Sequence, residues 1–256
     1  MSNISLRVAS MMNNLLMDSF SDIINSIEKE NPCINPTIIY NEGWMTRLLV
    51  FQSLIEKTVV GKIDFSRILN WTSEALISSP FVHAKDYKEG YTHADIAFGD
   101  FSVNYEKRGE IIINKDAKIF GIIEAKMGSN LSQRTTHVDD YNQASRNLAC
   151  IAYNTIDKID CETFFTVVAP ESMLIKHSIN KQIQIDNLIG QIEKRYNLYP
   201  QNEPVRDQID LILAKAWTCK IESVSYQDWI DKIVDIDAKN YLQEFYDKAK
   251  KWNRLI

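Results

Sequence analysis

The sequence of 256 residues is poor in the residues that interrupt regular structure. It contains only 8 glycines and 6 prolines, so long flexible linkers are not expected. We find no low-complexity tract and no internal repeat. The hydrophobic share of 45% and the charged share of 25% are ordinary for a globular protein. The length suits one large domain, or one domain with an added helical piece.

Cysteine is also scarce, and the four cysteines are far apart in the chain. They are Cys33, Cys150, Cys161 and Cys219, and no two of them form a CxxC pair. This spacing suits neither a zinc site nor a disulfide framework. It favours a reduced, cytoplasmic setting.

Long apolar runs and an excess of positive charge are both missing. No stretch approaches the roughly 18 apolar residues of a membrane-spanning helix, and residues 1–20 are too rich in Asn, Ser and Asp for a signal peptide. A membrane partner is therefore not expected. With 29 Lys and Arg against 34 Asp and Glu, the net charge is −5. This balance argues against coating of nucleic acid by bulk charge, but it allows a local basic groove.

The first part of the chain has helical periodicity. Apolar residues recur every three or four positions over 9–30, which predicts a helix. Asn41 is a suitable N-cap for a second helix over 42–57. We expect a third helix over 64–77. Between 80 and 126 the pattern changes to segments rich in Ile, Val and Phe, which predict strands.

The rest of the chain returns to helix with one strand inserted. We expect a turn at "NKDAK" (114–118), a helix within 137–156, a buried strand over 163–170, and helices from about 178 onward. This order predicts an α/β protein whose central mixed sheet is flanked by helices, with additional N- and C-terminal helices. We divide it into a helical segment (1–40), a core (41–200) and a C-terminal helical extension of the same domain (201–256).

The stretch "KIFGIIEAKMGSN" (118–130) contains an apolar run that stops at Glu124, Ala125 and Lys126. Side chains alternate along a strand, so Glu124 and Lys126 share one face. Charged groups are rarely buried unless they are paired or bound to a metal. Taken alone, the stretch also fits a strand end that frays into solvent.

Asp95 provides a second carboxylate, because it lies at the start of another apolar strand, "THADIAFGD". A meander through the "NKDAK" turn can bring the start of one strand beside the end of a neighbour. Asp95, Glu124 and Lys126 would then converge. Two carboxylates, a backbone carbonyl and waters are ligands that Mg²⁺ prefers. The competing interpretation is an unrelated α/β protein, and it predicts that the two carboxylates lie far apart.

Asp95 followed by Glu124-Ala125-Lys126 on the next long strand resembles the PD-(D/E)xK nuclease superfamily, which has the restriction-endonuclease-like fold. Ala94 stands where the motif usually has proline. The family core runs helix, three strands, helix, strand, and the order expected over about 42–170 is the same. The resemblance implies a nuclease that uses Mg²⁺, or alternatively Mn²⁺, to hydrolyse phosphodiester bonds by in-line attack on phosphorus.

The resemblance also implies roles for individual residues. Asp95 and Glu124 would bind the metal, with the carbonyl of Ala125 as a further ligand. Lys126 would position and activate the attacking water.

Two more residues fit the resemblance, and each has a plain structural alternative. Glu42 would add an acidic metal ligand from the helix before the sheet, but a Glu in a first helical turn also complements the helix dipole. Gln143 would orient the lysine, the water or the phosphate, or it is simply solvated. Tyr153 lies farther from Gln143 than the Q-x3-Y spacing that a subset of the family carries.

The expected partner is nucleic acid, and DNA is favoured because an endodeoxyribonuclease in restriction, phage defence or mobile-element biology is the family's usual role. The residues themselves do not distinguish DNA from RNA. A homodimer is plausible, because cutting a duplex usually takes two active sites. The second hypothesis is a non-catalytic module that binds nucleic acid or protein. The intact set of Asp95, Glu124 and Lys126 argues against it.

Overall fold

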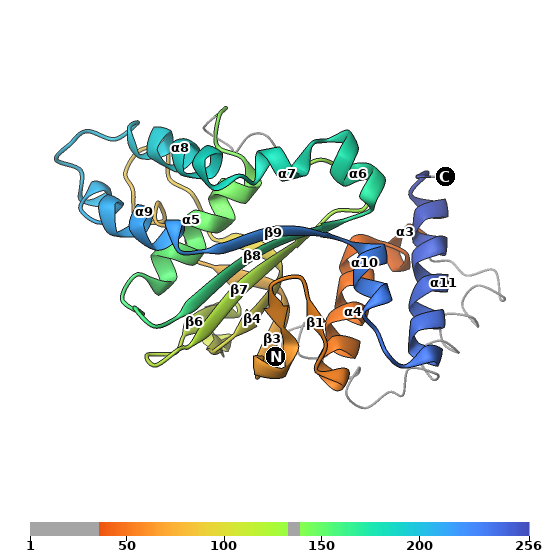
Figure 1. Cartoon of the computed structure of the whole chain (residues 1–256). Helices are drawn as coiled ribbons and strands as arrows, with labels where there is room; N and C mark the ends of the chain where they lie inside the picture. Colours follow the sequence, from red (N-terminus) through yellow and green to blue (C-terminus); the bar gives the residue numbers. More distant parts are fainter. Residues whose placement is uncertain (1–35, 133–138, 256) are drawn as a thin grey trace.

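The computed structural model describes residues 36–132 and 139–255 (Figure 1). The helix expected over 9–30 lies outside these residues. No helix in the two described ranges is long and apolar enough to cross a membrane.

The helices of the described residues surround a central sheet on two sides (Figure 1). In chain order the α-helices are α3 (Pro36–Ile39), α4 (Glu42–Glu56), α5 (Gln143–Thr155), α6 (Glu171–Lys176), α7 (Ile179–Gln182), α8 (Ile185–Tyr196), α9 (Ile209–Trp217), α10 (Tyr226–Asp231) and α11 (Ile236–Trp252). The 3-10 helices are η1 (Phe65–Arg67), η2 (Tyr105–Lys107) and η3 (Pro204–Arg206).

The central sheet has seven strands in the order β5-β6-β3-β4-β7-β8-β9. Their bounds are β3 (Asn70–Ile77), β4 (Thr92–Gly99), β5 (Phe101–Asn104), β6 (Glu110–Ile113), β7 (Ile119–Ala125), β8 (Glu162–Ala169) and β9 (Lys220–Ser225). A separate hairpin pairs β1 (Val59–Val60) with β2 (Ile63–Asp64). Strand β7 is antiparallel to β4 and parallel to β8, so the sheet is mixed.

The sheet separates two apolar cores. Helices α5, α8 and α9 pack on one face, and α4, α10 and α11 pack on the other. All seven residues of β7 are buried, as expected for a strand covered on both faces. Its Gly121 leaves space for the ring of Phe98 on β4, since a Cβ at this glycine would lie 2.2 Å from that ring. The coarse prediction of an α/β fold with a mixed sheet between helices is confirmed.

Several elements match their sequence signals. Helix α4 begins where predicted, because the side chain of Asn41 accepts a hydrogen bond from the backbone N–H of Trp44. The helix expected within 137–156 is α5, and its N-cap is Asn142, which accepts from the N–H of Ser145. The buried strand expected over 163–170 is β8.

The helix expected over 64–77 is wrong. This stretch contains η1 and the long strand β3, which pairs antiparallel with β4 from Asn70 opposite Gly99 to Ile77 opposite Thr92. The ladder with β4 satisfies the backbone of β3, and pairing with a distant strand overrides the local helical spacing.

Two further expectations need correction. The helical pattern from 178 onward hides β9, which adds to the sheet beside β8. The "NKDAK" turn does connect β6 to β7, but these strands are not neighbours, since β6 pairs with β3 and β5. Strand β4 therefore lies directly beside β7 rather than in a simple meander through β6.

Candidate active site

The predicted carboxylates lie where β4 and β7 stop pairing. The last pair of this ladder joins Ile96 to Ile123, so Asp95 and Glu124 are the next residues on the two strands. The Asp95 carboxylate accepts a hydrogen bond from the backbone N–H of Ala125, with 2.7 Å between Oδ2 and N. A side-chain contact thus replaces the next backbone contact of the ladder. Beyond this point β7 continues beside β8, where the N–H of Lys126 donates to the carbonyl of Val168.

The two carboxyl groups meet at this point. The carboxyl groups of Asp95 and Glu124 are close enough to act on each other's pKa. Burial, together with the negative charge of Asp95, raises the pKa of Glu124 to about 8. Burial also raises the pKa of Asp95, although the N–H of Ala125 and the charge of Lys126 oppose this shift. The site therefore holds two acidic groups so close that a proton or a cation between them relieves their repulsion.

The buried side chain of Glu124 receives three hydrogen bonds. Lys126 Nζ and Gln143 Nε2 each donate to Oε1 at 2.6 Å, and Asn147 Nδ2 donates to Oε2 at 2.9 Å. Gln143 and Asn147 are one turn apart on α5, so they share the helix face that contacts the end of β7. This face fixes both oxygens of Glu124 in place.

Lys126 is an ammonium group in this environment. Burial lowers its pKa, but the charge of Glu124 and the hydrogen bond to it outweigh burial, and the net pKa is raised. The raised pKa differs from the depressed value that a lysine acting as a base would need. The geometry favours a lysine that orients groups and neutralises charge.

Glu42 is the first residue of helix α4. Its charge acts on Lys126, which places it near the site. However, no three His, Cys, Asp or Glu side chains within 36–132 and 139–255 form a group able to hold a metal ion. Glu42 therefore does not complete a three-carboxylate group with Asp95 and Glu124 in this arrangement, and its role as a ligand stays a prediction.

Three residues near the site are not among those predicted from the sequence. Asn147 donates a hydrogen bond to Glu124. The charge of Asp95 acts on Arg47, and the charge of Glu74 contributes to the raised pKa of Asp95. The four-residue spacing from Gln143 could have identified Asn147. For Glu74 the sequence carries no comparable signal, because β3 has the apolar spacing of a helix. Nothing in the sequence of α4 distinguishes Arg47.

The donor set suits a hard cation such as Mg²⁺. Gln143 Oε1 and Asn147 Oδ1 are buried oxygens with no hydrogen-bond partner among the described residues. Buried polar atoms normally have a partner, which can be a water or an ion. The two carboxylates are sufficient protein ligands for this ion, since Mg²⁺ commonly uses only one or two protein carboxylates and keeps several waters.

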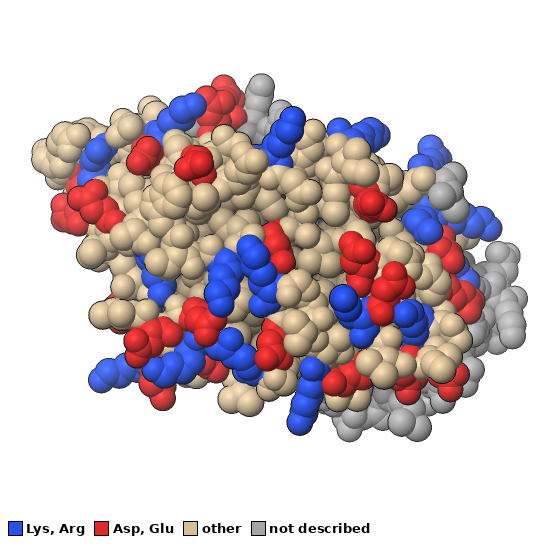
Figure 2. Space-filling model, in the orientation of Figure 1, with Lys and Arg blue, Asp and Glu red and all other residues tan. Residues whose placement is uncertain are grey.

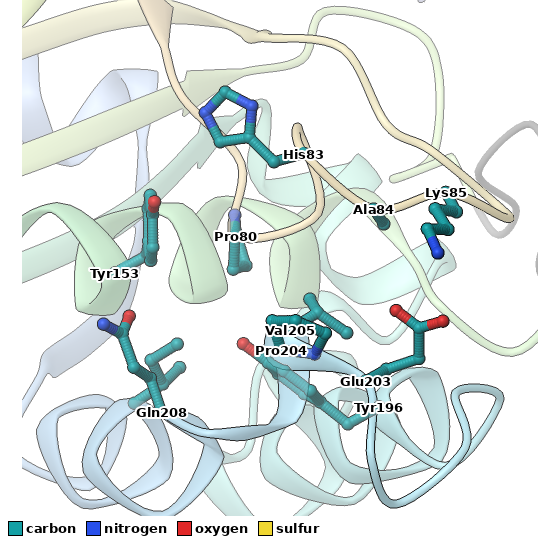
Figure 3. Close-up of a pocket in the computed structure, with 11 residues that line it drawn as sticks. Pro80, His83, Ala84, Lys85, Tyr153, Tyr196, Glu203, Pro204, Val205 and Gln208 are labelled. Atoms are coloured by element: carbon teal, nitrogen blue, oxygen red, sulfur yellow. The ribbon is translucent and has the colours of Figure 1, made fainter.

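A cavity of about 280 Å³ lies away from this site (Figure 3). It is formed beside α5, α8 and α9, and Tyr153, Tyr196 and Gln208 are among its lining residues. None of the predicted site residues lines it. The cavity is therefore distinct from the cluster around Glu124.

Charge on the visible surface is mixed. Figure 2 shows Lys and Arg side chains interspersed with Asp and Glu on the face that carries β9. This face has no broad area of one sign. Recognition of a polyanion would have to come from a few local cations.

The comparisons with known proteins give no match: no family model, no curated protein and no solved structure matches the chain.

Proposed function

We propose that the protein is a Mg²⁺-dependent nuclease of the restriction-endonuclease-like fold that hydrolyses phosphodiester bonds in DNA. One observation carries this proposal. The carboxyl groups of Asp95 and Glu124 meet at the ends of two central strands, and the ammonium group of Lys126 is bonded to Glu124. An unrelated fold with a chance match would place the two acids far apart.

The order of elements supports the proposal. Helix α4, strands β3, β4 and β7, helix α5 and strand β8 follow one another as helix, three strands, helix, strand. The short hairpin of β1 and β2 comes between α4 and β3, and the hairpin of β5 and β6 comes before β7. The D and ExK positions lie on the second and third of these three strands, next to each other in the sheet.

The residues of the chain have separate tasks in this proposal. Asp95, held by the N–H of Ala125, and Glu124, held by α5, provide the carboxylates for the metal. When bound, Mg²⁺ would activate a water and neutralise charge that develops on the phosphate. Lys126 would orient that water and add positive charge near the reacting phosphate. The carbonyl of Ala125 and the carboxylate of Glu42 stay proposed ligands.

The setting and partners follow from the same proposal. Cys150, Cys161 and Cys219 are free, buried thiols, which fits a cytoplasmic protein. The substrate is DNA, and cleavage of both strands of a duplex would use two copies of the chain.

A crystal soaked in Mn²⁺, combined with a cleavage assay, tests the proposal. We expect anomalous density between Asp95 and Glu124, and we expect the Lys126→Ala variant to bind DNA but lose cleavage. A matched control is Lys118→Ala, which removes an exposed lysine at the other end of β7. The absence of a metal ion between the carboxylates, together with full activity of Lys126→Ala, would contradict the proposal. DNA binding without cleavage by the unaltered protein would instead indicate a non-catalytic module.

A further inference from the structure

Glu74 has an unusual backbone conformation next to the candidate site. Its φ of +53° lies in the left-handed region, although it is not a glycine and lies inside β3. Ser73 pairs with Ile96 and Ala75 pairs with Ala94, so Glu74 faces Asp95 between these two pairs. Strained backbone of this kind persists only where its surroundings hold it, and it is concentrated at functional sites.

The side chain of Glu74 forms an ion pair with the guanidinium group of Arg47. Its Oε1 accepts a hydrogen bond from Arg47 Nη2 at 3.1 Å. The Glu74 side chain is 56% exposed, whereas that of Arg47 is only 14% exposed. Ion pairs with one well-solvated partner contribute little to stability. The pair alone is therefore a weak reason to keep a strained residue at this position.

The guanidinium of Arg47 has contacts besides the one with Glu74. It lies over the ring of Trp44 at 5.5 Å, and Gly43 leaves room for it, since a Cβ there would be 3.1 Å from Nη1. Its Nε is buried and has no hydrogen-bond partner among the described residues. Helix α4 and the ring of Trp44 therefore hold the guanidinium in place independently of Glu74.

Arg47 lies next to the proposed site, because its partner Glu74 is opposite Asp95 in the ladder of β3 and β4. Both Glu74, on the solvent side, and the buried Asp95 act on the guanidinium. A polyanion that reaches Asp95 past Glu74 would meet this cation. A guanidinium fork matches phosphate oxygens, and exposed Glu74 can be released into water at little cost.

We propose that Arg47 binds a phosphate of the DNA backbone next to the scissile bond, and that Glu74 holds its guanidinium until the phosphate displaces the carboxylate. This inference rests on the proposed nuclease function and assigns the substrate contact of the same site. A purely structural Arg–Glu pair predicts that loss of either partner has the same effect. The displacement model predicts opposite effects on DNA affinity.

The test measures binding of a short fluorescein-labelled DNA duplex to the full chain by anisotropy in EDTA, over a range of salt concentrations. We expect Arg47→Ala to raise Kd about 10-fold and to reduce the slope of log Kd against log salt by about 1. Glu74→Gly should lower Kd several-fold, because the competing carboxylate is gone. Glycine accepts a positive φ, so this variant should keep its Tm.

Two further variants make the result specific. Arg47→Lys keeps the test usable if Arg47→Ala does not fold. It should retain the salt dependence of Kd, because the charge is kept, but bind DNA more weakly, because lysine lacks the guanidinium fork. Arg67→Ala removes an arginine from a different ion pair, with Glu162, and should leave Kd unchanged.

Cleavage of the same duplex by the unaltered protein in Mg²⁺ separates the two proposals. If the protein cleaves DNA but Arg47→Ala and Glu74→Gly leave Kd unchanged, or both weaken it, the displacement model is wrong and the nuclease proposal stands. If the unaltered protein neither binds nor cleaves DNA, both proposals are wrong.

Discussion

At the scale of single residues, the site depends on how Glu124 is held. A fully buried carboxyl group is stable only with hydrogen-bond partners, and here α5 and Lys126 provide them. The sequence predicts the neighbourhood of Glu124 and Lys126, because strand alternation is a local rule. It does not predict Glu74, since a positive φ at a glutamate depends on tertiary contacts that no local pattern encodes.

Asn147 should act by positioning Glu124. We expect Asn147→Ala to reduce the rate of DNA cleavage about 10- to 100-fold, as is typical when a partner of a metal ligand is removed. The matched control is Asn154→Ala on the same helix, whose side chain bonds instead to the carbonyls of Ser78 and Cys150. It should change Tm without changing the rate. An unchanged rate in Asn147→Ala, measured at saturating Mg²⁺, would rule out the positioning role.

At the scale of elements, local signals succeed where the local structure is self-sufficient. Helix α4 has its own N-cap and a first turn that starts at Glu42, so the start of the helix can be predicted from the sequence. Strand β9 is short and contains Lys220 and Glu222, and it becomes a strand only by pairing with β8. A sequence pattern cannot reveal such pairing between segments that are far apart in the chain.

Close packing of β4 against β7 depends on a glycine. We expect Gly121→Ala to lower the free energy of unfolding by about 1–3 kcal/mol, because the added Cβ would overlap the ring of Phe98. Gly190→Ala on α8 is the opposite case, since nothing lies within 4 Å of its added Cβ. It should stabilise the protein by roughly 0.5–1 kcal/mol. Urea denaturation of both variants measures the change in the free energy of unfolding. A change in the same direction for both variants would contradict this packing.

Glu162 at the start of β8 ties this strand to η1 and β9. Hydrogen bonds from Arg67 and Lys220 lower the pKa of Glu162 to about 2. Because the folded-state pKa is depressed from the model-compound value of 4.5, this stabilisation is present above pH 4.5 and is lost as the pH falls toward 2.

We therefore expect Glu162→Gln to be less stable than the unaltered protein at pH 7. The difference should be at most about 1 kcal/mol, since water screens this partly exposed cluster. It should shrink between pH 4.5 and pH 2. Chemical denaturation at several pH values tests this, and a difference that grows on acidification would contradict the assignment.

At the scale of the whole molecule, the candidate site lies at the junction of the two halves of the fold. Helix α5 belongs to one core and α4 to the other, and the sheet lies between them. Glu124 takes two of its three partners from α5, while Arg47 on α4 pairs with Glu74, which lies opposite Asp95. The α/β class is predictable from the sequence. The convergence of both helices on the ends of β4 and β7 is a property of the assembled sheet.

The most direct measurement compares DNA cleavage by the unaltered protein and by Asp95→Asn, on plasmid, linear and single-stranded DNA, with Mg²⁺ and with EDTA. Asparagine retains the size of the side chain but removes the charge that a metal needs. We predict cleavage only by the unaltered protein and only with Mg²⁺, with Asp95→Asn folded and inactive. Cleavage that persists in Asp95→Asn or in EDTA, or no cleavage of any DNA by the unaltered protein, would contradict the account.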